Sequence, residues 1–573
     1  MANKTMEGGQ ALIRCLENEG VEYIFGYSGG AAIPIFDALI TTETKIKFVL
    51  VRHEQGAAHM ADGYARATGK PAVVLVTSGP GATNTLTGIM TAHMDSVPMI
   101  VLSGQSVSWM LGKDAFQEAD IFGITMPVVK HSYLVKASNE IPRIVREAFH
   151  ISTTGRPGPV LIDIPKDLSA GPCTADLHAE MDLPGYDLNQ SVDNDTILEI
   201  AEALAKSKRP LILAGHGAMI SGADPILLAL AEKARIPVTT TLLGKGVFPE
   251  SHELSLGMLG MHGTAYANKA VCECDLLLNV GSRFDDRILG QPDKFCKDAT
   301  IVHIDIDAAE IGKMVAPQIT CVADAKTALD ELIKHVPVLE TTSWLKKLDG
   351  YKVKYPLKFK RQGSLKMQHI IDEFYKLTDG KACVATDVGQ HQMWAAQFYK
   401  NDSRYNWLSS GGAGTMGVGL PYCIGAAFGR PNDIHVCFVG DGGFQMTFFE
   451  LATAALHKLP IKIVVLNNHY LGMVRQWQEL FYDDRKSGVD LEGNPDFVKL
   501  AESFGIKGFN LRRPGDVKRV LQTALDYNDG PCLINCEVEK TDNVFPMIPA
   551  GAVIEDMLIE PPSVKLEKPT GST

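Results

Sequence analysis

The chain of 573 residues exceeds what one hydrophobic core normally supports, so we expect two to four domains. Its 45% hydrophobic and 21% charged residues fit a globular protein, and a net charge of −12 without a basic block argues against a nucleic-acid partner. Eleven dispersed cysteines, no secretory leader and no apolar stretch of membrane-spanning length predict buried thiols, no zinc site and a cytoplasmic location.

The first third of the chain contains short apolar runs separated by helical segments, which is the pattern of a doubly wound parallel α/β sheet. Residues 168–195 are polar, contain prolines and have little periodicity, so they are predicted to form a linker. We therefore expect a first domain at residues 1–180. Its expected strands are 21–26, 48–51, 72–76, 99–102 and 160–164.

The middle and last thirds continue this alternation of strands and helices, so each is expected to form a further doubly wound sheet. Charged residues 336–360 are predicted to be a second linker, and residues 563–573 a frayed tail. The second and third domains are expected at residues 190–340 and 362–560. Their expected strands are 210–217, 236–240, 276–280, 301–305, 383–387, 434–439, 461–466 and 531–536.

The most specific signal lies just after two of these runs, where Asp441 and Asn468 follow. Strand, helix and strand of this length form a right-handed parallel crossover, so both side chains reach one sheet edge, where open α/β sheets bind ligands. Their oxygens suit Mg²⁺ that carries a diphosphate, and Gly440, Gly442 and Gly443 let the backbone approach phosphates. The alternative is an ordinary strand-helix-strand unit with an Asp-Gly turn, which the following Asn-Asn pair makes less favourable.

Gly-Asp-Gly at 440–442 followed by Asn-Asn at 467–468 resembles the thiamine diphosphate and Mg²⁺ motif of thiamine-dependent enzymes. The resemblance implies a thiamine diphosphate-binding fold, in which an N-terminal pyrimidine domain and a C-terminal diphosphate domain flank a Rossmann-like middle domain. It also implies that Asp441, the side chain of Asn468 and the backbone carbonyl of Tyr470 bind Mg²⁺.

Glu54 directly follows the run 48–51, at a strand end that opens a helix. Thiamine chemistry needs a carboxyl group that bonds the aminopyrimidine ring and promotes the imino tautomer, which removes the thiazolium proton. The alternative is a first-turn glutamate that the helix dipole stabilises. Residues 51–61 closely resemble the activating-glutamate motif of acetohydroxyacid synthases, and this resemblance favours the catalytic role.

The resemblance to acetohydroxyacid synthases covers nearly the whole chain. Residues 25–30 match a glycine turn of that family in which Gly30 approaches the reacting centre, although Ser28 stands where the family usually has Pro. Residues 77–84 match the next loop. By the same resemblance, Gln117 lies near the active centre and Lys166 at its entrance.

In the last third, the resemblance implies that Met416 lies beneath the cofactor and holds it in a folded V shape; the alternative is a core methionine. Met473, Val474 and Trp477 recur at helical spacing soon after Asn468, so this stripe is expected to line a pocket unless it is plain core. In the family the tryptophan favours 2-oxobutanoate as acceptor. The other implied cofactor contacts are Gly389, Gln390, His391 and Gly414.

The middle third carries Gly281 at the end of the run 276–280, followed by charged residues. Among them Arg287 is suited to bidentate pairing with a substrate carboxylate, the alternative being a solvated Asp-Arg cluster. The segment resembles the flavin region of the same family, which implies FAD in a mainly structural role. The residues assigned to FAD are Arg156, Gly215, Gly217, Thr241, Leu242, Met261, His262, Gly281, Arg283, Asp285, Arg287, Asp305, Ile306, Glu310 and Asp324.

By these motifs the chain is identified as a member of the biosynthetic, FAD-containing acetohydroxyacid (acetolactate) synthase catalytic subunits. The resemblance implies decarboxylation of pyruvate on thiamine diphosphate and transfer of the hydroxyethyl unit to pyruvate or 2-oxobutanoate. The products, 2-acetolactate and 2-aceto-2-hydroxybutanoate, feed branched-chain amino-acid synthesis. It further implies a homodimer or tetramer in which Glu54 and the metal motif come from different subunits, a separate regulatory subunit, and no membrane partner.

Three alternatives remain at this point. A pyruvate oxidase with a redox-active flavin is disfavoured by the segments around Arg287 and Trp477. A non-catalytic paralogue is disfavoured by the presence of Glu54, Asp441 and Asn468. A catabolic acetolactate synthase without flavin would differ in its FAD content.

Overall fold

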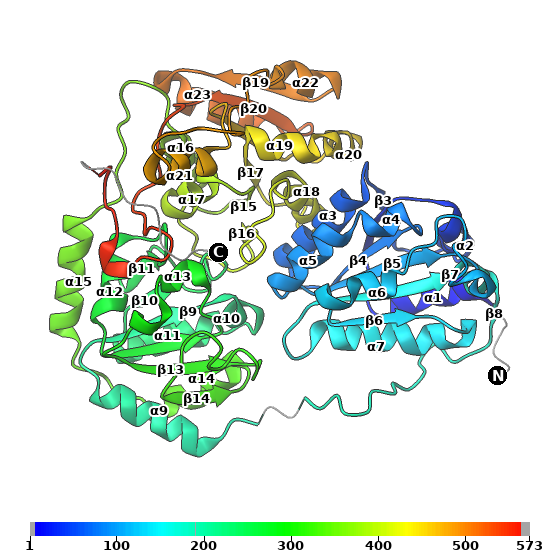
Figure 1. The fold of residues 1–573 in the computed structure, drawn as a ribbon, viewed down its shortest axis with the longest axis horizontal. Helices are drawn as coiled ribbons and strands as arrows, with labels where there is room; N and C mark the ends of the chain where they lie inside the picture. The colour runs from blue at the N-terminus through cyan, green and yellow to red at the C-terminus, as the bar shows by residue number, and fades with distance from the viewer. Residues whose placement is uncertain (1–5, 189–190, 563–573) are drawn as a thin grey trace.

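The computed structural model describes residues 6–188 and 191–562, and it contains three six-stranded parallel sheets flanked by helices (Figure 1). The predicted class, α/β with three doubly wound parallel sheets, is therefore confirmed. One sheet falls within each expected domain range, while the domain bounds themselves stay a prediction. The predicted tail at 563–573 lies outside the described residues.

The first sheet has the strand order β3-β2-β4-β5-β7-β6, and a short antiparallel pair, β1 with β8, ties the start of the described chain to the end of this domain. The strands of this domain are β1 (Met6–Glu7), β2 (Tyr23–Gly26), β3 (Lys47–Leu50), β4 (Ala72–Val76), β5 (Met99–Gln105), β6 (His131–Leu134), β7 (Pro159–Pro165) and β8 (Pro172–Cys173). Its helices are α1 (Gly8–Asn18), α2 (Ile33–Thr41), α3 (Glu54–Thr68), α4 (Pro80–Thr83), α5 (Leu86–Met94), α6 (Ile121–Thr125), α7 (Ile141–Thr153) and α8 (Lys166–Ala170).

The third sheet has the order β16-β15-β17-β18-β20-β19, which is the winding of the first sheet, so the expected likeness of the two outer thirds is confirmed. Its strands are β15 (Cys383–Thr386), β16 (Trp407–Leu408), β17 (His435–Gly440), β18 (Lys462–Asn467), β19 (Lys507–Leu511) and β20 (Cys532–Glu537). Its helices are α16 (Met367–Thr378), α17 (Gln390–Phe398), α18 (Gly419–Gly429), α19 (Asp441–Thr447), α20 (Leu451–Leu456), α21 (Gly472–Phe481), α22 (Phe497–Ser503) and α23 (Val517–Asp526).

The middle sheet is wound differently, in the order β11-β10-β9-β12-β13-β14, which is the strand order of a Rossmann fold. Its strands are β9 (Pro210–Ala214), β10 (Val238–Thr240), β11 (Ser255–Met258), β12 (Leu276–Val280), β13 (Thr300–Asp305) and β14 (Ile319–Val322). Its helices are α9 (Asn194–Lys206), α10 (His216–Ile220), α11 (Asp224–Ala234), α12 (Ala265–Glu273), α13 (Asp286–Leu289), α14 (Ala325–His335) and α15 (Thr342–Lys354).

Seven strands were not predicted. Five of them, β6, β11, β14, β16 and β19, lie at the edge of a six-stranded sheet, and the other two, β1 and β8, form the short antiparallel pair. An edge strand has one side without a strand neighbour and a partly exposed face, so it lacks the continuous apolar run that marks a central strand. Strand β14, for example, alternates between buried and exposed residues. The central strands, which are buried on both faces, fall where their apolar runs predicted them.

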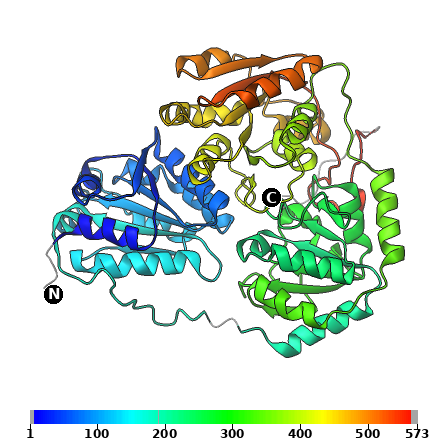
Figure 2. The same cartoon turned by 180° about the vertical axis from the view of Figure 1, so that it is seen from behind.

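The prediction of a second linker at 336–360 was wrong, because helix α15 occupies most of it. Trp344 and Leu348 on one face of α15 are buried against the middle domain, and the indole N–H of Trp344 donates to the carbonyl of Pro210 at 3.1 Å. Because lysines occupy the other face of α15, the short apolar face with Trp344 and Leu348 was not recognised as a helix pattern in the sequence. The first linker begins with the rest of α8 and with β8, and residues 174–188 then extend along the molecule (Figure 2).

Two further sequence expectations concern membranes and thiols. Within residues 6–188 and 191–562, no helix is both long and apolar enough to cross a bilayer. All eleven cysteines are unpaired, and only Cys272 is not buried, so the prediction of buried thiols is confirmed for the other ten. The described part of the chain also contains no cluster of three or more His, Cys, Asp or Glu arranged as metal ligands.

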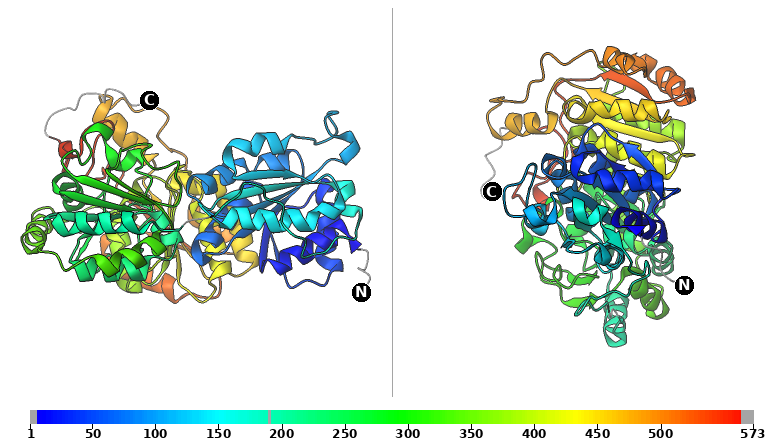
Figure 3. Two further views of the ribbon diagram at one scale, coloured as in Figure 1. Left: turned by 90° about the horizontal axis from the view of Figure 1, so that it is seen from below. Right: turned by 90° about the vertical axis from the view of Figure 1, so that its right-hand side faces the viewer.

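The first and third domains share a hydrophobic core through the packing of α3 against α18 (Figure 3). The two backbones approach so closely that a Cβ at Gly63 would lie 2.4 Å from the carbonyl oxygen of Tyr422, and one at Gly425 would lie 1.9 Å from that of Met60. Only glycine permits this contact. The middle sheet, by contrast, has hydrophobic clusters of its own.

A buried ion network lies beside the α3–α18 contact. The guanidinium of Arg66 on α3 donates to Asp62 at 2.6 Å and to Asp95 at 2.8 Å, and all three side chains are almost completely buried. Arg66 also donates to the carbonyl of Ser409 in the third domain, and the Tyr422 hydroxyl donates to Asp62 at 2.7 Å. Because an unpaired buried charge costs about 3–5 kcal/mol, the network strongly favours one relative position of the two domains.

His59 on α3 makes the stability of this interface depend on pH. Burial and the nearby Arg66 lower the pKa of His59 from 6.5 to about 3. Below pH 6.5 the unfolded chain therefore binds a proton at His59, whereas the folded chain does not. The contribution of neutral His59 to the free energy of unfolding is complete above pH 6.5 and is lost as the pH falls. By pH 5 the loss is about 2 kcal/mol.

We expect the wild-type chain to lose about 2 kcal/mol more than the His59→Gln variant between pH 7 and pH 5, because glutamine does not titrate in this range. The measurement is the free energy of the first unfolding transition in urea at both pH values. Parallel pH dependences for the two proteins would contradict the prediction.

Candidate active site

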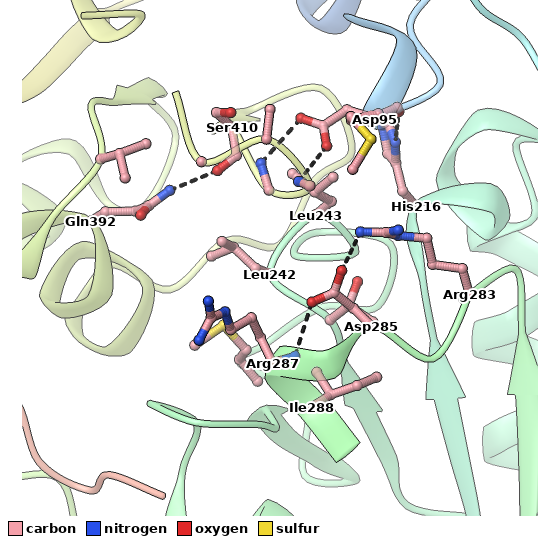
Figure 4. A pocket seen from close by; sticks show the side chains of 18 of the residues that line it. Asp95, His216, Leu242, Leu243, Arg283, Asp285, Arg287, Ile288, Gln392 and Ser410 are labelled. Atoms are coloured by element: carbon pink, nitrogen blue, oxygen red, sulfur yellow. Dashed lines mark hydrogen bonds and ion pairs between the residues drawn. The ribbon is translucent and has the colours of Figure 1, made fainter. Parts of the chain in front are cut away.

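A cavity of about 840 Å³ lies where the carboxyl ends of the strands of the middle sheet face those of the third sheet. Residues 94–96 and 153–157 of the first domain close another side. Figure 4 shows a part of this cavity, with Asp95 of the first domain at one wall and Arg287 of the middle domain opposite. Because open α/β sheets bind ligands beyond the carboxyl ends of their strands, this cavity is the candidate active site.

The cavity opens at the point in each of these two sheets where the strand order reverses. In the middle sheet this point lies between β9 and β12, where the N–H of Gly215 donates to the carbonyl of Val280 and the N–H of Gly217 to that of Gly281, both at 2.9 Å. In the third sheet it lies between β15 and β17, and Asp441 directly follows β17. Such switch points are the places where doubly wound folds take up nucleotides and diphosphates.

All the residues that the sequence assigned to FAD line the cavity except Gly215. Gly215 lies behind the wall, where a Cβ would come within 2.2 Å of the carbonyl oxygen of Gly281, so its role is the close approach of two strands. Asp324 also caps α14 by accepting the N–H of Thr327 at 2.9 Å. The side chain of Arg156 donates to Glu310 at 2.7 Å, so these two predicted contacts bind each other across a domain boundary.

The charged cluster after β12 faces the cavity (Figure 4). The Arg283 guanidinium pairs with the carboxylate of Asp285, which also accepts the N–H of Arg287 at 3.0 Å. The side chain of Arg287 is about half exposed, and its Nε lies 3.6 Å from the carboxylate of Asp286. Arg287 therefore keeps most of its donors available for an anion.

Asp441, Asn468 and Tyr470 line the other end of the cavity, after the neighbouring parallel strands β17 and β18. The Asp441 carboxylate accepts the side-chain amide of Asn494 at 2.7 Å, and the Asn468 side-chain oxygen accepts the N–H of Tyr470 at 3.2 Å. Burial raises the pKa of Asp441 to about 6. One buried carboxylate flanked by amide and carbonyl oxygens fits a hard cation that keeps other ligand positions for water and phosphate.

Met416 lies over the Gly-Asp-Gly turn, where its methyl carbon would be 3.7 Å from a Cβ at Gly442. The loop that carries Met416 is held by Asp387, at the end of β15. The fully buried Asp387 carboxylate accepts the N–H groups of Val388 at 2.8 Å and of Gly417 and Gly419 at 3.0 Å. The position of Met416 is thus held through hydrogen bonds of its neighbours.

Two buried polar atoms on α17 face the cavity without a partner. The side-chain oxygen of Gln390 and Nε2 of His391 have no hydrogen-bond partner among the described residues, although both side chains line the cavity. Burial lowers the pKa of His391 to about 4, so its ring is neutral at neutral pH and can donate one hydrogen bond. Buried polar atoms are rarely left unpaired, so a ligand at this end would satisfy them.

The four predicted catalytic residues, all in the first domain, do not reach this cavity. Gly30, Glu54, Gln117 and Lys166 are absent from its lining, and all lie at the carboxyl edge of the first sheet. Glu54 is partly exposed and accepts the side-chain amide of Asn84 at 3.0 Å. Within one chain, the structure therefore separates Glu54 from Asp441.

The sequence reasoning missed several residues that shape the cavity. Asp95 accepts the N–H groups of Gly411 and Gly412, and its carbonyl lies 2.9 Å from Nδ1 of His216 (Figure 4). No local pattern marks Asp95, because its partners, Arg66 on α3 and residues of the two other domains, are distant in the sequence. Asp387 left a usable signal, since it follows an apolar run as Asp441 does.

The chain matches three family models. They describe the N-terminal TPP binding domain, the central domain and the C-terminal TPP binding domain of thiamine pyrophosphate enzymes, over residues 6–124, 197–332 and 387–536. The three sheets and the cavity between them are thus those of a thiamine pyrophosphate enzyme.

Relatives narrow the class further. The chain is 47% identical over 565 residues to the acetolactate synthase large subunit of Pyropia yezoensis, covering 95% of this chain and 94% of the relative. It is 46% identical over 557 residues to that of Lactococcus lactis subsp. lactis (97% and 96%) and 44% identical over 571 residues to that of Haemophilus influenzae (98% and 99%). The chain belongs to the acetolactate synthase large subunit family.

We expect Asp387→Asn to weaken thiamine diphosphate binding by roughly tenfold, because an unsatisfied backbone N–H costs about 1–3 kcal/mol and loosens the loop that carries Met416. The measurement is calorimetric titration with the cofactor and Mg²⁺. Asp379→Asn is the matched control, since this exposed carboxylate pairs only with Lys381 among the described contacts. Equal affinities for wild type and Asp387→Asn would contradict the prediction.

Proposed function

We propose that the chain carries out the acetolactate synthase reaction in this cavity, with thiamine diphosphate and Mg²⁺ at the third-sheet end and FAD at the middle-sheet end. Pyruvate is the donor and loses carbon dioxide. A second pyruvate or 2-oxobutanoate is the acceptor, giving 2-acetolactate or 2-aceto-2-hydroxybutanoate. Thiamine diphosphate, when bound, supplies a nucleophilic carbon and an electron sink for the decarboxylation.

Mg²⁺ would be held by the carboxylate of Asp441, the amide oxygen of Asn468 and the backbone carbonyl of Tyr470. The buried carboxylate and its oxygen neighbours support this set, because Mg²⁺ prefers hard oxygen ligands and is usually completed by water and phosphate. The unpaired side-chain oxygen of Gln390 can only accept a hydrogen bond, so it suits a water on the metal, while the unpaired Nε2 of His391 would face the diphosphate when it carries the ring proton. The further proposed cofactor contacts are Gly389, Gly414, Met416, Gly440, Gly442, Gly443 and Met473.

FAD would occupy the Rossmann-like switch point of the middle sheet. The support is the continuous lining from Gly217 through Gly281 to Ile306, together with the charged cluster around Arg283. Because the reaction has no net redox change, the role of the flavin is mainly structural. Gly215 would act only through the strand packing behind the wall.

The observation that carries the proposal is the separation of Glu54 from the metal motif within one chain. The first sheet, which bears Glu54, has the same strand order as the third sheet, which bears Asp441. The carboxyl edge of the first sheet, however, does not line the cavity. We infer that a second copy of the chain brings its cavity to this edge. Exposed apolar side chains nearby, such as Phe116 and Tyr27, support burial against a partner.

In that assembly the Glu54 carboxyl group would hydrogen-bond to the aminopyrimidine ring and exchange a proton with it. The side-chain amide of Asn84 orients this carboxyl group by donating to one of its oxygens. Gly30 leaves the reacting centre open, since nothing lies within 4 Å of the position of a Cβ there. Gln117 and Lys166 would border the same centre from the first domain.

Selection of the acceptor would fall to Arg287, Val474 and Trp477, which line the cavity between the two cofactor ends. The partly free guanidinium of Arg287 suits the carboxylate of a 2-oxo acid. The relatives are named large subunits, so we also infer a smaller regulatory partner.

Asp441→Ala should abolish retention of thiamine diphosphate, because it removes the proposed carboxylate ligand of Mg²⁺, and should leave FAD bound at the other end of the cavity. The measurement is cofactor content after gel filtration, by thiochrome and flavin fluorescence. A protein that retains thiamine diphosphate, or that loses both cofactors together, would contradict two separate sites.

Mixing tests the shared active site directly. Glu54→Gln and Asp441→Ala should each be nearly inactive alone, but co-expression should restore roughly a quarter of wild-type activity, because about half of the dimers are hybrids with one intact site of two. Acetolactate formation is the readout, with each variant expressed alone as control. No recovery in verified hybrids would mean that Glu54 and Asp441 act from the same chain.

A further inference from the structure

Glu450 connects the third domain to the start of helix α3. It ends a short 3₁₀ turn, Phe448–Glu450, within the crossover between β17 and β18. Its side chain is fully buried, and one carboxylate oxygen accepts the backbone N–H of Arg52 at 3.0 Å and of His53 at 3.1 Å. The other oxygen accepts the hydroxyl of Thr453 at 2.6 Å, which fixes the carboxylate on its own domain.

The two N–H donors stand immediately before Glu54, the first residue of α3. A Cβ at Gly56 would lie 2.3 Å from the Glu450 carboxylate, so the first turn of α3 rests directly on this side chain. An anion at the beginning of a helix is also stabilised by the helix dipole. The backbone that carries Glu54 is therefore held by a residue of another domain.

The other interactions of this segment do not replace that contact. The Arg52 guanidinium donates back to the carbonyls of Leu50 and Val51, and the His53 ring accepts the N–H of Gln55. These hydrogen bonds join residues of the same segment, so they would not keep it in place relative to the third domain. Only the Glu450 carboxylate ties its backbone N–H groups to a part of the structure outside the first domain, among the contacts of the described residues.

We propose that Glu450 is a positioning residue for Glu54, which it holds in the geometry that the reaction requires. This inference rests on the proposed function, in which Glu54 serves the cofactor of a second copy. Glu450 belongs to the same crossover as Asp441 and Asn468. The crossover that binds the metal in one active site thereby sets the position of the activating carboxylate in the other.

The test compares Glu450→Ala, Glu450→Asp and Glu450→Gln. Alanine removes the acceptor, aspartate withdraws it by one methylene, and glutamine keeps a carbonyl oxygen in place. Glu147→Ala is the matched control. Glu147 lies on α7, is as buried as Glu450 and likewise accepts a backbone N–H, that of Asp182. Thermal unfolding reports the stability of every variant.

Two readouts separate positioning from stability. The first is hydrogen-deuterium exchange of backbone amides in a peptide covering Arg52 and His53, measured without cofactor. The second is the rate of deuterium exchange at the C2 carbon of bound thiamine diphosphate, which Glu54 promotes. A misplacement of about 1 Å costs on the order of 10²-fold in rate, so Glu450→Ala should slow C2 exchange by roughly that factor.

We expect faster amide exchange and slower C2 exchange in Glu450→Ala, a smaller effect in Glu450→Asp, and values within about threefold of wild type in Glu450→Gln and Glu147→Ala. If Glu450→Ala does not fold, Glu450→Asp decides. Unchanged C2 exchange in the aspartate or alanine variant, or an equal loss in Glu147→Ala, overturns the inference. Unchanged C2 exchange in Glu54→Gln would instead overturn the proposed role of Glu54 itself.

Discussion

The site depends above all on the contact between α3 and α18, and on the buried charges beside it. Gly63 and Gly425 bring the two backbones together, and Arg66 then satisfies carboxylates of the first domain and a carbonyl of the third. Because these charges are buried, the first and third domains are strongly held in this one arrangement. Asp95 extends the network to the loop that leads to Met416, so the domain arrangement and the cavity wall are set together.

This arrangement explains why three similar sheets have different tasks. The switch points of the middle and third sheets open into one cavity, whereas the carboxyl edge of the first sheet, where Glu54 follows the edge strand β3, lies outside its lining. The first and third sheets have the same winding, so each presents a comparable edge to a ligand. Because the packing of α3 against α18 holds the two sheets in one arrangement, a single chain does not direct both edges at this cavity, which is the reason for the proposed second copy.

Glu450 also holds the first domain against the third, at the segment that precedes Glu54. It lies in the crossover between Asp441 and Asn468, yet its carboxylate holds the backbone just before Glu54. The two halves of the proposed shared site are therefore joined, within each chain, by a short and buried contact. Any displacement of the metal-binding crossover would be passed to the start of α3.

The α/β class, the central strands and the meeting of Asp441 with Asn468 at one sheet edge could be predicted from the sequence, because these depend on local patterns: a buried run, a glycine turn, and an oxygen-bearing side chain at a strand end. Such patterns failed at the edge strands and at α15, whose exposed faces dilute the apolar pattern. Only the tertiary structure decided that Gly215 lies behind the cavity wall, that Asp95 shapes it and that Glu54 lies outside it. The physical reason is distance along the chain: Glu450 and Arg52 are 398 residues apart, and their contact follows from the packing of two domains, which no local periodicity encodes.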